Sequence, residues 1–125
     1  MKGRVWGYLG RVIPWMAIGV VSAISSIPAS RLPDLSAFPG GDKWLHGALF
    51  MSLTLLFRGW RGPGRALSEW LPPAVLILLL FAVADEWHQS RVPGRVADFA
   101  DGAADGVGIA AGALLAWIDS RSKKT

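Results

Sequence analysis

Three short segments of the sequence carry side chains whose types and spacing could support binding or catalysis. The first is "DKWLH", in which Asp42 and His46 are four residues apart and would share one face of a helix, with Lys43 beside them. An aspartate at this spacing can orient an imidazole ring or share a cation with it. This segment could therefore supply a general base or two ligands of a metal ion.

The other two segments add carboxylates and an amide. In "DEWHQ", Glu86 and Gln89 are three residues apart, so both would lie on one side of a helix. In "RVPGRVADFADGAADG", the spacing of Asp98, Asp101 and Asp105 predicts a single face at the N-terminus of a helix. The helix dipole favours negative charge at that end. These residues could form hydrogen bonds or bind a cation.

Acidic residues outnumber basic ones in these segments. The acidic residues are Asp42, Asp85, Glu86, Asp98, Asp101 and Asp105, and the basic ones are Lys43, Arg91 and Arg95. A purely structural network of ion pairs is one interpretation, in which Arg95 could hold a carboxylate with two hydrogen bonds. Such a network needs no surplus of acid, so the surplus favours a binding site.

The composition indicates that membrane helices position these segments. The chain is 52% hydrophobic and only 18% charged, with a mean hydropathy of +0.38. Four windows approach the roughly 20 apolar residues that cross a hydrocarbon core about 30 Å thick. They lie at about 8–27, 42–60, 70–88 and 99–118. We therefore expect an all-α fold, an integral membrane bundle of four transmembrane helices in one domain over residues 1–125.

The charged residues divide unequally between the two sides of this bundle. Both termini and the second loop carry nine basic and two acidic residues, whereas the first and third loops carry four basic and seven acidic ones. The positive-inside rule then places both termini in the cytoplasm. The three polar segments would lie together on the extracytoplasmic side. This topology accounts for the isoelectric point near 10.1 without a nucleic-acid partner.

Details of the helices lead to further expectations. We expect Asp42 to cap the second helix, and Pro72 and Pro73 to fall in the first turn of the third. The first helix has basic residues before it and "SSIPAS" after it, as a signal peptide does, but lacks a clean cleavage pattern, so we expect it to be retained. The fourth helix is rich in glycine, which favours burial or a homo-oligomer through that helix.

At these residues the sequence resembles the VanZ-like family of small bacterial membrane proteins. The resemblance is carried by "DKWLHGALF", "DEWHQSRVPGR" and "DFADGAADGVGIAAGALL", which follow in order over about the C-terminal two-thirds of the chain. The family pattern has Asp-Lys-x2-His, then Asp-Glu-x2-Gln, then Arg-x5-Asp-x3-Asn followed by glycine. It marks Asp42, Lys43, His46, Glu86, Gln89, Arg95 and Asp101 in this chain. This sequence has Asp105 where the pattern has asparagine, which adds a charge.

The resemblance implies a location and a general role. The family is named for a protein associated with low-level resistance to the glycopeptide teicoplanin. A multi-pass protein of the bacterial inner membrane, acting in the cell envelope, is therefore implied. The resemblance does not supply a catalysed reaction.

Three functions fit these observations. The first is a non-enzymatic protein whose outer polar face binds membrane lipids through a headgroup, or a lipid-linked cell-wall precursor or glycopeptide. The second is a membrane-embedded enzyme acting on a lipid-linked substrate, in which Asp42 orients His46 as a general base. The third is a proton- or ion-coupled transporter that titrates Asp101 and Asp105.

The first hypothesis uses the widest set of residues. Its expected binding residues are Asp42, Lys43, His46, Glu86, Gln89, Arg91, Arg95, Asp101 and Asp105. We expect no cofactor under this hypothesis, because the chain has no cysteine and no compact metal motif such as His-Glu-x2-His. Under the enzymatic hypothesis Asp42, His46 and Glu86 are the candidate catalytic residues, and in one version of it they could instead ligate a divalent cation.

Overall fold

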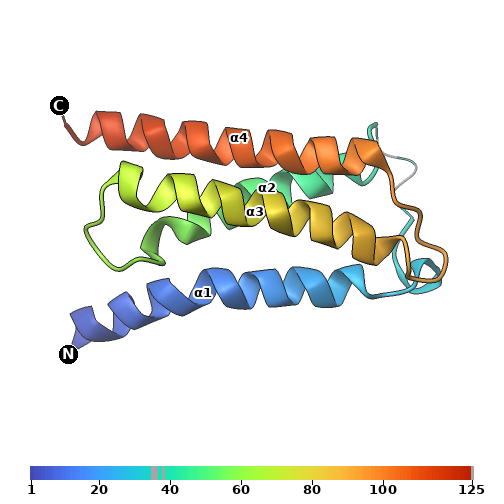
Figure 1. Ribbon diagram of the computed structural model, residues 1–125, viewed down its shortest axis with the longest axis horizontal. Helices are drawn as coiled ribbons and strands as arrows, with labels where there is room; N and C mark the ends of the chain where they lie inside the picture. The colour runs from blue at the N-terminus through green and yellow to red at the C-terminus, as the bar shows by residue number, and fades with distance from the viewer. Residues whose placement is uncertain (35–36, 38, 125) are drawn as a thin grey trace.

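A computed structural model describes residues 1–34, 37 and 39–124, and in this part of the chain it contains four α-helices and no strand (Figure 1). The helices are α1 (Lys2–Ser25), α2 (Lys43–Leu56), α3 (Leu67–Gln89) and α4 (Phe99–Ser122). Two short 3-10 helices, η1 (Ala29–Arg31) and η2 (Phe57–Gly59), follow α1 and α2. The expected all-helical bundle is thus confirmed.

The helices differ in their ability to cross a membrane. By length and composition α1, α3 and α4 are each long and apolar enough to do so. The 14 residues of α2 extend only about 21 Å at 1.5 Å per residue, which is less than a hydrocarbon core. The predicted second span, 42–60, is instead divided between α2 and η2.

The other helices extend beyond the predicted spans. The first begins at Lys2 instead of residue 8, the third at Leu67 instead of residue 70, and the fourth continues to Ser122 instead of residue 118. An apolar window locates the part of a helix that suits lipid, whereas the backbone hydrogen bonds continue into the polar residues at either end.

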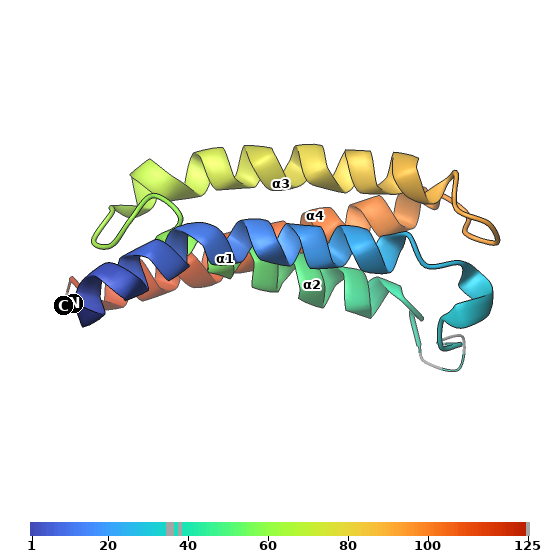
Figure 2. The same cartoon turned by 90° about the horizontal axis from the view of Figure 1, so that it is seen from below.

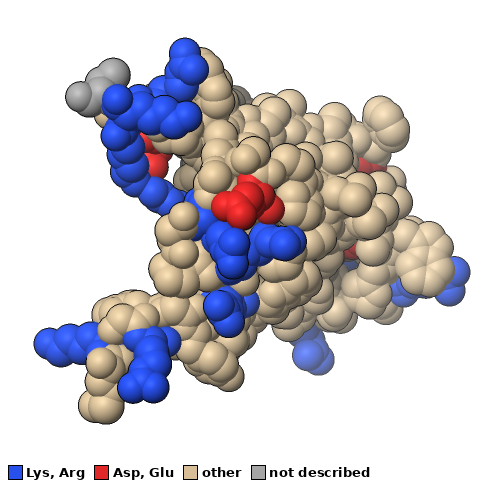
Figure 3. Space-filling model, turned by 60° about the vertical axis from the view of Figure 1, so that its left-hand side comes forward, with Lys and Arg blue, Asp and Glu red and all other residues tan. Residues whose placement is uncertain are grey.

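The chain runs back and forth along the bundle. Figures 1 and 2 place both termini and the connection between α2 and α3 at one end, with η1 and the connection between α3 and α4 at the other. Figure 3 turns the end with the termini forward and shows lysine and arginine side chains spread over it. The three polar segments therefore lie at the opposite end of the bundle from most of the basic residues.

Close packing of α2 on α4 forms the centre of the bundle. These two helices share the most extensive contact in the chain. A β-carbon at Gly108 would overlap the carbonyl oxygen of Gly47, and one at Gly112 would lie 2.9 Å from the carbonyl oxygen of Met51. Gly108 and Gly112 thus permit close packing inside the chain, while the homo-oligomer stays a prediction.

By contrast, α1 is the most exposed helix. Its buried residues are Pro14, Val21 and Ser25. Trp15, which lies in the middle of the helix, packs edge-on against Phe57 of η2 with ring centroids 5.4 Å apart. This contact fixes α1 against the end of α2, and the remaining surface of α1 is available to lipid.

Two expectations about helix starts are wrong. Asp42 occupies the N-cap position of α2, but its side chain accepts no capping hydrogen bond, because its backbone is already helical (φ −71°, ψ −12°). Pro72 and Pro73 lie inside α3 instead of in its first turn, because the helix begins at Leu67. The Oε2 of Glu69 accepts a hydrogen bond from the backbone N–H of Ala66 at 2.8 Å and so stabilises this earlier start.

Candidate functional site

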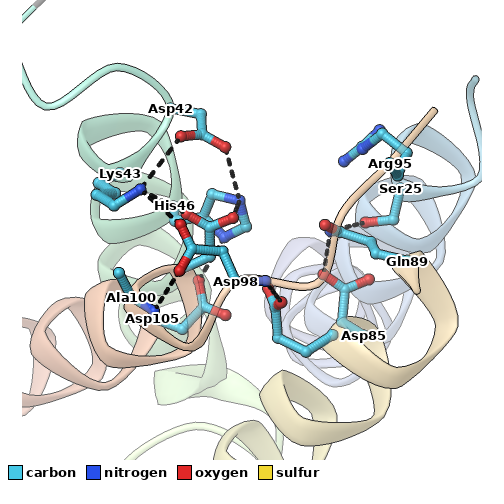
Figure 4. Close-up of polar contacts among 12 residues, drawn as sticks. Ser25, Asp42, Lys43, His46, Asp85, Gln89, Arg95, Asp98, Ala100 and Asp105 are labelled. Carbon is cyan, nitrogen blue, oxygen red and sulfur yellow. Dashed lines mark hydrogen bonds and ion pairs between the residues drawn. The ribbon is translucent and has the colours of Figure 1, made fainter. Parts of the chain in front are cut away.

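The three polar segments meet at the end of the bundle opposite the termini (Figure 4). The first turn of α2 carries the side chains of "DKWLH", the last turn of α3 carries those of "DEWHQ", and the first two turns of α4 carry the aspartates. Close packing of α2 and α4 brings the first and third segments into direct contact. The site is therefore assembled from residues that are about 55 to 60 positions apart in the chain.

His46 lies among three carboxylates. Its Nδ1 is 2.7 Å from Oδ1 of Asp105, while its Nε2 is 3.9 Å from Oδ2 of Asp101 and 4.0 Å from Oδ2 of Asp42. The Asp105 side chain is fully buried, and that of His46 is 11% exposed. The imidazole thus has a hydrogen-bonded carboxylate on one side and two more carboxylates on the other.

Lys43 forms ion pairs with Asp42 and Asp101, two of the carboxylates around His46, and with Asp98. Its Nζ is 3.1 Å from Oδ2 of Asp98, 3.3 Å from Oδ1 of Asp101 and 3.8 Å from Oδ1 of Asp42. Asp42 and Asp101 therefore each turn one oxygen toward Lys43 and the other toward His46. Asp98 also caps α4, because its Oδ1 accepts a hydrogen bond from the backbone N–H of Ala100 at 2.9 Å. This bond, and then Lys43, lower the pKa of the Asp98 carboxyl from its ordinary value.

Two buried carboxylate oxygens in the site have no hydrogen-bond partner among the described residues. They are Oε1 of Glu86 and Oδ2 of Asp105. The other oxygen of Glu86 accepts a bond from the backbone N–H of Asp98 at 3.3 Å. Buried polar atoms without partners are uncommon because their desolvation is not compensated. Such atoms often mark the place of a ligand.

Gln89 belongs to a separate buried network between α1 and α3. Its Nε2 donates to Oδ2 of Asp85 at 3.0 Å and lies 3.4 Å from Oγ of Ser25. All three side chains are buried. Next to them, Oγ of Ser26 and Nε2 of His88 are 2.9 Å apart. The sequence interpretation did not include the two serines, although polar residues at the end of an apolar helix are a usable signal.

The two arginines do not neutralise the acidic cluster. The guanidinium of Arg91 stacks on the ring of Trp87, 4.1 Å from its centroid. The Nη1 of Arg95 donates to the carbonyl oxygen of Ile27 at 3.1 Å, at the end of α1 where helical carbonyls lack partners. In the part of the chain that the structure describes, neither arginine forms an ion pair with the six acidic residues of the polar segments.

A cavity of about 620 Å³ lies beside His46, between the end of α1 and the start of α2. Its polar lining includes Asp42, His46 and Arg95, and its apolar lining includes Ile24 and Leu45. A molecule in this cavity would contact a cation, a carboxylate, an imidazole and aliphatic carbon at once. Arg95 thus lies near the cluster across the cavity, although it does not pair with it.

The potential metal ligands group differently from the set named in the sequence. Among the described residues, two groups of three each bring one potential ligand atom per residue to within 4.8 Å of the others. One group is Asp42, His46 and Asp101, and the other is His46, Glu86 and Asp105. The expected set of Asp42, His46 and Glu86 is not one of these groups. His46 is common to both because its ring lies between α4 and the start of α2.

Comparison with known proteins extends the resemblance beyond these motifs. No curated protein and no solved structure matches the chain. A family model described as VanZ/LLP1 matches residues 10–119, which include most of α1, all of α2 and α3, and nearly all of α4. The match covers nearly the whole chain, and the protein therefore belongs to the VanZ-like family.

Proposed function

We propose that this protein binds the phosphate-bearing headgroup of a lipid-linked cell-wall precursor, from the extracytoplasmic side of the bacterial inner membrane. The supporting observation is the cavity beside His46, which combines Arg95 and Asp42 with the aliphatic side chains of Ile24 and Leu45. A lipid has the same division, with a charged headgroup joined to an apolar tail. The volume of about 620 Å³ lies within the range of small-molecule sites.

The cavity lining combines one cation with several groups that can form hydrogen bonds to such a headgroup. Arg95 supplies fixed positive charge for a phosphate, and arginine can bind phosphate through two parallel N–H groups. Asp34, Asp42 and His46 line the same cavity and offer hydrogen bonds to the hydroxyl or amide groups of an attached sugar or peptide. Asp101 and Asp105 contact the ring of His46 and orient it, and Glu86 lies close to both His46 and Asp105. Gln89 links α3 to Ser25 of α1.

The distribution of charge supports the orientation. The end of the bundle with both termini carries nine basic and two acidic residues, which favours the cytoplasm under the positive-inside rule. The cavity would then open at the level of the outer headgroups. Any effect of this protein on teicoplanin resistance would act through the precursor, because a whole glycopeptide exceeds a cavity of about 620 Å³.

Lipid binding tests the proposal directly. Purified protein in nanodiscs would be titrated with a polyprenyl phosphate and with the uncharged polyprenol of the same length, and binding measured by native mass spectrometry. We expect Arg95→Gln to weaken binding of the phosphate by about tenfold or more, because a hydrogen bond to a charged group is lost. Glutamine retains a donor for the Ile27 carbonyl, so the loop should keep its position.

Arg91→Gln is the matched control. Arg91 stacks on Trp87 and is not among the residues lining the cavity. This variant removes the same charge from the same loop and should bind as the parent protein does. Equal affinity of the parent and Arg95→Gln for the phosphate, or equal losses in both variants, would contradict the proposal.

A further inference from the structure

We propose that His46, Glu86 and Asp105 form a binding site for one divalent transition-metal cation between α2, α3 and α4. This site shares His46 with the cavity in which we place the headgroup, but Glu86 and Asp105 are not among the lining residues of that cavity, and metal binding does not depend on headgroup binding. Each of the three residues comes from a different helix and offers one ligand atom, and these atoms lie within 4.8 Å of one another. A single ion could therefore contact all three.

The two unpartnered oxygens are the observation that points to a ligand here. Oδ2 of Asp105 and Oε1 of Glu86 are buried without a hydrogen bond in the described chain, and the Asp105 side chain is fully buried. His46 bonds only the other oxygen of Asp105. The fully buried Asp105 and the half-buried Glu86 come from neighbouring helices, and their unpartnered oxygens have lost their hydration. A cation between them would compensate both penalties.

The three basic side chains of the polar segments do not contact the unpartnered oxygens of Glu86 and Asp105. Lys43 contacts Asp42, Asp98 and Asp101. The guanidinium of Arg91 stacks on Trp87, and that of Arg95 donates a hydrogen bond to the carbonyl of Ile27. The alternative group of Asp42, His46 and Asp101 is less suitable, because Lys43 already lies 3.3 Å from Asp101 and 3.8 Å from Asp42.

The ligand types select the class of ion. One imidazole nitrogen and two carboxylates suit Mn²⁺, Fe²⁺ or Zn²⁺ better than Ca²⁺ or Mg²⁺, which prefer oxygen alone. Nδ1 of His46 is the nitrogen on the side of Asp105, and as a metal ligand it would give up its hydrogen bond to that carboxylate. The ring proton would then lie on Nε2, which faces Asp101 and Asp42. Carboxylates beyond a histidine ligand orient its ring and make the metal-binding nitrogen more basic.

Metal content and affinity test this site without any lipid ligand. The full-length protein would be purified in detergent, stripped with a chelator, and titrated with Mn²⁺ and with Zn²⁺. Bound metal would be measured by elemental analysis, and Mn²⁺ also by electron paramagnetic resonance. We expect one ion per chain. Glu86→Gln and Asp105→Asn should each lower the affinity by at least about tenfold, the lower limit for residues that only support a ligand.

Asp98→Asn is the control for loss of charge alone. Asp98 is exposed, contacts Lys43 and caps α4, and asparagine is an equally good cap. This variant should bind Mn²⁺ like the parent protein. Asp105→Asn keeps the size of the side chain and matches the residue of the family pattern, so circular dichroism should show an intact fold. Absence of bound metal in the parent protein, or equal losses in Asp98→Asn and Asp105→Asn, would overturn the proposal.

Discussion

His46 and Asp105 link α2 to α4 through a hydrogen bond of 2.7 Å between Nδ1 and Oδ1. The bond lies where Asp105 is fully buried, so one oxygen of the carboxylate has exchanged its hydration for this contact. This bond connects His46 to Asp105, the residue at which the sequence has aspartate where the family pattern has asparagine. Removal of either partner therefore affects the fold as well as any ligand.

We predict that His46→Ala lowers the free energy of unfolding by about 3 kcal/mol, because it leaves the Asp105 carboxylate buried without a donor. The double variant His46→Ala/Asp105→Ala should be less destabilised than the sum of the two single variants. Unfolding in detergent, followed by circular dichroism during a denaturant titration, measures both quantities. Additive losses would show that the two residues do not interact.

The glycines of α4 should respond to substitution according to their position. Gly108→Ala places a β-carbon against the carbonyl of Gly47, so we predict a loss of about 1–3 kcal/mol in the free energy of unfolding. Gly106 has no atom within 4 Å of such a β-carbon, and Gly106→Ala should stabilise the helix by up to about 1 kcal/mol. The same unfolding experiment compares them, and similar effects of the two changes would contradict the packing described here.

The orientation in the membrane can be determined with single cysteines, since the natural chain has none. Ala97 is exposed in the connection between α3 and α4, and Lys124 is exposed at the other end of the bundle. We predict that a membrane-impermeant maleimide labels Ala97→Cys in intact cells and labels Lys124→Cys only after the membrane is opened. The reverse pattern would place the cavity in the cytoplasm.

The pair of Lys43 and Asp98 should contribute stability that depends on pH. The pKa of Asp98 is lowered from its ordinary value of 3.8, chiefly by the N–H of Ala100 and then by Lys43. Its contribution is therefore complete above the unfolded pKa and is lost as the pH falls through the folded pKa. Asp98→Asn keeps the cap but not the charge. The difference in Tm between the parent protein and this variant should shrink as the pH falls below about 4.

Much of the site follows from spacing along single helices. Asp42 and His46 lie on one face of α2, and Asp101 and Asp105 on one face of α4, because residues four apart are neighbours on a helix. The four apolar windows also predicted the four helices, with positions close to those in the structure. These features depend only on local geometry, which the sequence specifies directly.

Other features depend on how separate elements are rotated and joined. Arg95 reaches Ile27 instead of a carboxylate because the connection after α3 crosses the end of α1, which no spacing predicts. Ser25 meets Gln89 only because α1 turns that face toward α3. Phe57, where α2 gives way to η2, packs against Trp15 of α1, a contact between separate elements that no spacing predicts.

The shortness of α2 has a consequence for the surrounding bilayer. Its 14 residues lie beside helices of 23 or 24 residues, so the protein presents a shorter hydrophobic length to lipid on that side. A bilayer adapts to such hydrophobic mismatch by thinning locally. Thinning would draw the headgroup layer down toward Asp42 and His46 at the start of α2. A lipid-linked molecule diffusing in the plane of the membrane would then arrive at the cavity with its phosphate already at the depth of Arg95.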